Sequence, residues 1–177
     1  MAWLFAALAL LIWPGAALAQ SHQPYAGLEH RDVKSLSEAQ IADLRAGRGM
    51  GLALPAELNG YPGPAHVIEN ADALGLTAEQ RARTKGLFEA MKAEAIPVGE
   101  HLIEQETKLD HLFASHEISP AGLAAATLEI GTTQGKLREA HLKYHLAMME
   151  VLTPQQVAAY RKLRGYTSPQ SMPHRHH

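Results

Sequence analysis

The stretch LTPQQ, residues 152–156, decides the fold, because the chain carries the same phrase earlier as LTAEQ, residues 76–80. Each copy places a threonine three residues before a glutamine, which is the spacing of a helix capping box. The threonine hydroxyl accepts a hydrogen bond from the glutamine N–H, and the glutamine side chain accepts one from the threonine N–H. The six residues of the repeated motif are Leu76, Thr77, Gln80, Leu152, Thr153 and Gln156. The repeat therefore predicts two helix starts rather than a ligand-binding signature.

The residues around the motif support this interpretation. Pro154 fits the first helical position, where its missing N–H has no helical partner. Leu152 and Val157 can pack against each other as a hydrophobic staple across the start of that helix. A looser third copy, LSEAQ at residues 36–40, predicts another short helix. Each of these caps should contribute about 1 kcal/mol to stability.

Between the two copies, the chain predicts two long amphipathic helices. In residues 77–115, apolar side chains recur mostly at steps of three and four, the period of one helix face. They are Phe88, Met91, Ala95, Val98, Leu102, Leu109 and Phe113. Pro97 interrupts this stretch and predicts a kink near residues 93–97, because proline removes a backbone donor.

A turn at SHEISPAG, residues 115–122, separates the first long helix from the second. Ser119 is the predicted N-cap and Pro120 the first helical residue. The second helix should run to about residue 152, with an apolar face of Leu123, Ile130, Leu137, Tyr144, Met148 and Val151. Neither helix can bury its apolar face alone, so the two must pack antiparallel. The predicted fold class is all-α, a long antiparallel helical hairpin with short flanking helices.

Two glycines of the second helix are open to two interpretations. Gly131 and Gly135 lie one turn apart, near the level of Pro97 and Gly99 in the predicted hairpin. They let the two long helices approach closely, or they are glycines that the helix tolerates. The sequence supports both interpretations equally.

The first 19 residues have the pattern of a secretory signal peptide. They carry no charged side chain, and an apolar run meets Pro14-Gly15 before the small residues Ala17 and Ala19. This pattern predicts export, with cleavage after Ala19. The alternative is an uncleaved membrane anchor, because the run approaches the length of a spanning helix.

The chain after the signal peptide divides into residues 20–64, 65–166 and 167–177. The first part is an N-terminal arm, predicted to be polar and loose at its start and to form turns where it is rich in Gly and Pro, over residues 47–64. The second is the helical domain, which opens with a short helix that Gly75 ends. The third is a tail of Pro, Ser and His residues that is predicted to be disordered.

The composition argues against several classes of function. The chain has no cysteine, and hence no disulfide framework and no thiolate metal site. Its formal net charge of −2 gives no indication of a nucleic-acid partner. Nucleophile elbow, metalloprotease and phosphate-loop patterns are missing, so we do not expect an enzyme.

The 11 histidines include a pair on the second long helix. His141 and His145 stand at i and i+4, a spacing at which two imidazoles can share one metal ion. Folding the hairpin brings Glu94 to the level of His141, with Met91 one turn away. The candidate ligands for Zn, Ni or Cu are therefore His141, His145, Met148 and Glu94, and methionine favours Cu(I). The alternative is that both histidines pack at the edge of the core.

Two Leu-Thr-x-x-Gln motifs that flank a long helical hairpin, in an exported chain without cysteine, resemble the Spy/CpxP family, also called the LTXXQ family. The resemblance covers about residues 65–166. It implies a periplasmic helical protein, often a cradle-shaped dimer, that acts as an ATP-independent chaperone or modulates envelope stress. Relatives of the family include periplasmic zinc-resistance-associated and nickel- and cobalt-sensing proteins.

Two functional hypotheses follow. The first is a periplasmic chaperone or envelope-stress protein that shields unfolded clients on a helical surface without ATP or another required cofactor. The alternative is a periplasmic protein that binds or senses a heavy metal through His141 and His145. The expected partners are unfolded or envelope proteins and a second copy of the chain. We expect no nucleic acid, and no membrane unless residues 1–19 stay attached.

Overall fold

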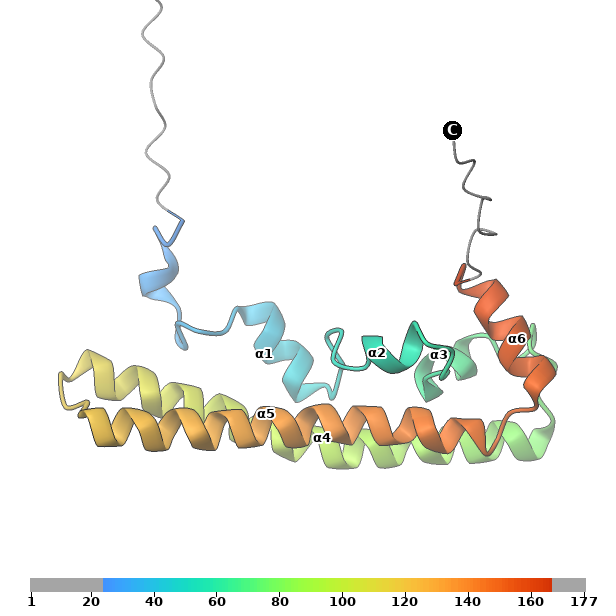
Figure 1. Ribbon diagram of the computed structural model, residues 1–177. Coiled ribbons are helices and arrows are strands. Elements are labelled where there is room, and N and C mark those ends of the chain that lie inside the picture. Colours follow the sequence, from blue (N-terminus) through green and yellow to red (C-terminus); the bar gives the residue numbers. More distant parts are fainter. Residues whose placement is uncertain (1–23, 167–177) are drawn as a thin grey trace, which may run out of the picture.

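Two long antiparallel helices, α4 (Ala78–Ala114) and α5 (Pro120–Met149), lie side by side and form the body of the molecule (Figure 1). The computed structural model describes residues 24–166. The predictions made for residues 1–19 and 167–177 lie outside this range. The turn between the two helices confirms the predicted hairpin.

Five shorter helical elements flank the hairpin. They are η1 (Leu28–His30), α1 (Glu38–Arg45), α2 (Leu54–Glu57), α3 (Pro64–Glu69) and α6 (Pro154–Leu163). Helices α1, α2 and α3 follow one another along one side of the hairpin, and α6 turns away at the end where α5 stops (Figure 1). No strand occurs in residues 24–166, which confirms the all-α fold class. Within that range, no helix has an apolar stretch long enough to cross a membrane.

The helix starts have the predicted caps. Thr77 and Thr153 each close a capping box with the glutamine three residues later, at the starts of α4 and α6. Ser37 makes the same box at α1. Ser119 accepts a hydrogen bond from a backbone N–H in the first turn of α5. The helix boundaries that depend on these caps were therefore readable from the sequence.

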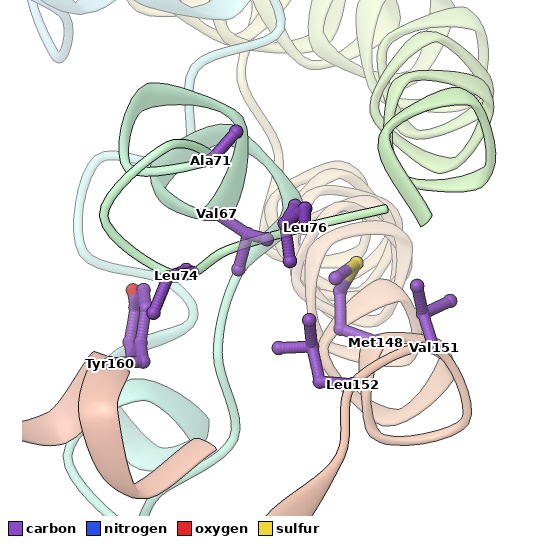
Figure 2. Close-up of a cluster of buried hydrophobic side chains, with 8 residues drawn as sticks. All are labelled: Val67, Ala71, Leu74, Leu76, Met148, Val151, Leu152 and Tyr160. Carbon is purple, nitrogen blue, oxygen red and sulfur yellow. The ribbon is translucent and has the colours of Figure 1, made fainter. Parts of the chain in front are cut away.

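The two motif copies meet at one end of the hairpin. Gln80 Nε2 donates to Gln156 Oε1 at 2.8 Å, and Gln156 Nε2 donates back to Gln80 Oε1 at 3.0 Å. Each of these oxygens also accepts the N–H of its own capping threonine. Leu76 and Leu152 precede the caps, and both are buried in one apolar cluster with Met148 (Figure 2). The repeat thus builds a single joint that ties the start of α4 to the start of α6.

The N-terminal arm, predicted to be loose at its start, is exposed or half-buried over residues 24–32 and contacts the hairpin from Val33 onward. Val33 is buried with Leu44 in a second apolar cluster, along the middle of α4 and α5. Lys34 Nζ pairs with Asp110 Oδ2 at 2.9 Å on the surface of α4. Polar side chains gave this segment no helical or strand period. Polar side chains at its end bond to acidic side chains of α4.

The glycine that permits a close approach is Gly99 on α4. A Cβ at this position would lie 2.9 Å from the Leu44 carbonyl oxygen, so the end of α1 sits directly on α4. No atom would lie within 4 Å of a Cβ on Gly131 or Gly135, so α5 merely tolerates these glycines. Helix α4 continues through Pro97 as one element, so the predicted kink does not end it.

The short helix that was predicted to reach Gly75 is α3, which stops at Glu69. The Asn70 side chain donates to a backbone carbonyl of α3 at 2.8 Å, and such local bonds compete with continuation of a helix. Turns then carry Ala71 and Leu74 into the apolar cluster at the joint (Figure 2). The predicted stop residue, Gly75, ends these turns with a φ of 60°, where the Leu76 N–H donates to the Ala71 carbonyl.

Candidate functional site

A pocket of about 260 Å³ lies between α5 and the Gly/Pro-rich segment, which the sequence had placed only as turns. His141 and His145 form its floor on α5, and Met91 reaches it from α4. Gly49 and Gly63 contribute to the opposite wall. The i, i+4 spacing brings the two histidines to one helix face, as predicted. The structure adds that the Gly/Pro-rich segment covers this face.

His141 is almost completely buried, with 2% of its surface exposed. Its Nε2 has no hydrogen-bond partner among the described residues. Burial, and secondarily the nearby charge of His145, lowers the pKa of His141, so its imidazole is neutral near pH 7. A buried polar nitrogen without a partner is rare in folded proteins and needs an explanation. A neutral imidazole nitrogen with a free lone pair is also the commonest metal ligand.

The backbone of the covering segment orients His145. Its Nδ1 lies 2.7 Å from the Tyr61 carbonyl oxygen, which can only accept, so Nδ1 carries the proton and donates. This tautomer leaves the lone pair on Nε2. A Cβ on Gly63 would lie 3.0 Å from that Nε2 and 2.8 Å from Cε1, so only glycine lets the covering segment pack this closely against the ring. Histidines that bind metals are typically oriented by a carbonyl or carboxylate in this way.

Glu57, a buried carboxylate that lines the pocket, was not among the residues predicted from the sequence. Its Oε1 accepts hydrogen bonds from the hydroxyls of Tyr160 and Tyr166 and lies 3.4 Å from Arg164 Nε. Its Oε2 has no hydrogen-bond partner in residues 24–166 and lies 3.8 Å from His145 Nδ1. Burial and the bond to Glu57 raise the pKa of Tyr160. The only signal in the sequence was a single acid inside the apolar stretch LPAEL, residues 54–58.

Glu94 and Met148 were predicted beside the histidines, but the structure places both outside the pocket. Glu94 accepts a hydrogen bond of 2.6 Å from Tyr144 and pairs with Lys143. These contacts lower the pKa of Glu94, while burial and Glu94 raise the pKa of Tyr144 to about 12. Met148 is fully buried in the apolar cluster at the joint (Figure 2). Counting residues outward from the turn of a hairpin predicts how far along the helix a residue lies. It does not predict the direction in which the side chain points.

The donor set of the pocket is small. In the part of the chain that the structure describes, no three side chains of His, Cys, Asp or Glu lie together as a metal-binding group. The pocket is lined by the imidazoles of His66, His141 and His145 and by the thioethers of Met91 and Met50. His66 is partly exposed and its Nδ1 pairs with Glu69, so His141 and His145 are the two buried imidazoles. The unpartnered nitrogen of His141 and the small set of buried donors fit a metal ion with few ligands. They do not fit an ion that needs a full cage of oxygen ligands.

Comparison with known proteins gives one family. A family model described as heavy-metal resistance matches residues 49–159. The matched range contains both motif copies, the histidine pair and residues 49–64 of the Gly/Pro-rich segment that covers it. This family is related to the Spy/CpxP-like helical proteins. No match was found among curated proteins or among solved structures.

Proposed function

The chain belongs to the heavy-metal resistance family, and on that premise we propose that it is an exported, periplasmic protein that binds a transition-metal ion through His141 and His145. The description of this family supports a function in heavy-metal resistance. The ion would be held and sequestered rather than used for catalysis. Zn, Ni and Cu are the candidates, because imidazole suits all three.

One observation carries this proposal: His141 has a buried, unpartnered Nε2 and lines the same pocket as His145. If the two histidines served only to pack, an apolar side chain would fill the space without an unsatisfied nitrogen. A metal ion would satisfy that nitrogen. The neutral state of His141 means that binding need not first remove a proton near pH 7.

Two groups next to His145 would favour the binding of a cation in the pocket. The Tyr61 carbonyl fixes the tautomer of His145, so the ring is oriented before an ion arrives. The free Oε2 of Glu57 lies behind the same ring and would stabilise positive charge on it. Both groups would raise affinity without being ligands themselves.

The test is calorimetric titration of the full chain with Zn, Ni and Cu. We expect one site that is lost in His141→Ala/His145→Ala and retained in a control with His101→Ala/His111→Ala, two exposed histidines of α4. A second control replaces the tail histidines His174, His176 and His177 by Ala. Circular dichroism checks that every variant is folded. Unchanged binding in the pocket variant would mean that the pair is structural.

A second candidate function is favoured by exposed apolar side chains along the hairpin. Leu128 is 72% exposed and Leu146 60% exposed, and Phe113 lies exposed near the turn. We propose that such residues hold exposed apolar segments of unfolded envelope proteins, alone or in a dimer of this chain. Purified protein should then suppress aggregation of an unfolded client, and Leu128→Ser/Leu146→Ser should weaken this effect. No suppression at several-fold molar excess would rule the activity out.

A further inference from the structure

We propose that the pocket selects monovalent copper, Cu(I), over divalent ions, with Met91 as the third ligand beside His141 and His145. This inference rests on the proposed metal-binding function. It goes further because it selects one of the three candidate metals and makes a ligand of Met91, which the sequence had placed only one helical turn from the predicted ligand Glu94.

The donor atoms available in the pocket favour Cu(I). A structural zinc site usually has four nitrogen, sulfur or carboxylate ligands. Here no three His, Cys, Asp or Glu side chains gather anywhere in residues 24–166. A thioether is a soft ligand, which favours Cu(I), and Met91 lines the pocket with both histidines. Met50 lines the same pocket and is partly exposed, so a second thioether stands near the entrance.

The charges around the pocket point the same way. Glu57 is the only acid that lines it, and the carboxylate is already compensated by Arg164 and by hydrogen bonds from two tyrosines. The described walls therefore carry no excess negative charge for a dication. The cost of moving an ion out of water rises with the square of its charge, so a dication costs roughly four times as much as a monocation. A buried pocket of neutral donors thus favours the ion of lower charge.

The position of Met91 would let one ion bridge the two long helices. It comes from α4, whereas the histidines come from α5, so the three donors would join the two long helices. It is 7% exposed, with the pocket beside it. Leucine could fill a core position of this size at little cost, but it supplies no sulfur. Met91→Leu should therefore keep the packing of this position while it removes the sulfur ligand.

The experiment is an anaerobic titration of the full chain with Cu(I) against a chromophoric Cu(I) chelator, alongside Zn(II) calorimetry. In Met91→Leu we expect Cu(I) affinity to fall by at least about tenfold, with Zn(II) affinity unchanged. The matched control is Met149→Leu, a partly exposed methionine of α5 outside the pocket, which should change neither affinity. X-ray absorption of the Cu(I)-loaded wild type should show sulfur in the first coordination shell, and this signal needs no variant.

The outcomes separate this inference from the proposed function. If the histidine pair binds Zn(II) as tightly as Cu(I), or if the loaded protein shows no sulfur around copper, Cu(I) selection by Met91 is wrong and metal binding stands. An unchanged Cu(I) affinity in Met91→Leu has the same meaning. If neither ion binds at the histidine pair, both proposals fail.

Discussion

A single glycine determines whether the covering segment can close over the histidine pair. Gly63 lies against the His145 ring, and any side chain there would meet Cε1 at 2.8 Å. The Tyr61 carbonyl that orients the same ring stands two residues earlier in the chain. The residues that orient and contact the His145 ring therefore belong to a short stretch of the Gly/Pro-rich segment, not to the helix that carries His145.

Gly63→Ala should destabilise the protein by about 1–3 kcal/mol and weaken metal binding, because the new methyl group must displace the ring or the covering segment. The measurement is the free energy of unfolding by urea, with calorimetry of the metal. The matched control is Gly86→Ala on α4, where a Cβ meets no atom within 4 Å. That change should stabilise the helix by about 0.5–1 kcal/mol. Equal effects of the two substitutions would contradict the proposed contact.

Tyr144 should stay protonated after an ordinary tyrosine has ionised, because burial and the Glu94 carboxylate raise its pKa to about 12. The folded state then holds this proton more tightly than the unfolded state. The stability that it contributes is present below the ordinary pKa of about 10 and is lost as pH rises towards about 12. Ultraviolet titration of tyrosinate should show a late step that Tyr144→Phe removes. Tyr25→Phe, at an exposed tyrosine, should leave that step in place.

At the scale of the elements, the joint between α4 and α6 depends on two glutamines that each do two jobs. Gln80 and Gln156 close the capping boxes of their own helices and also bond each other. A cap acts on one helix, whereas the pair fixes the position of one helix relative to another. The motif therefore carries tertiary information in addition to its local signal.

A double-mutant cycle should detect this tertiary part. Gln80→Ala and Gln156→Ala should couple by about 0.5–3 kcal/mol in the free energy of unfolding, as expected for residues in direct contact. The control pairs Gln80→Ala with Gln40→Ala, because Gln40 closes the capping box of α1 and bonds only Ser37 among the described side-chain contacts. These two should add within about 0.5 kcal/mol. Additivity in both cycles would reduce the motif to capping alone.

At the scale of the whole molecule, Glu57 links segments that are far apart in the sequence. It projects from α2, and its carboxylate contacts side chains of α6 and of the residues that follow it. Glu57 thus holds the covering segment at the end of the hairpin where α6 begins. At the other end of the covering segment, α1 precedes it and packs on α4 at Gly99. The pocket is lined by residues of the covering segment, Glu57 among them.

Glu57→Gln should lower the free energy of unfolding by about 1–3 kcal/mol, because it leaves buried polar partners without the charged acceptor. The matched control is Glu100→Gln, which removes the surface pair with Arg45. Such an exposed pair contributes less than about 1 kcal/mol. Urea denaturation of both variants gives the comparison. A Glu57 variant that is no less stable than the control would show that the covering segment is held in another way.

The sequence by itself determined the helix starts and the hairpin, because capping boxes and a three-and-four apolar period are local signals that the backbone reads directly. It also placed His141 and His145 on one helix face, since their spacing alone requires it. Only the tertiary structure decided which other residues join them. Met91 and Glu57 reach the pocket and Glu94 does not, because the side to which a residue points depends on how helices pack. The role of the Gly/Pro-rich segment was likewise invisible, because turns carry no period and their position is set by contacts with distant residues.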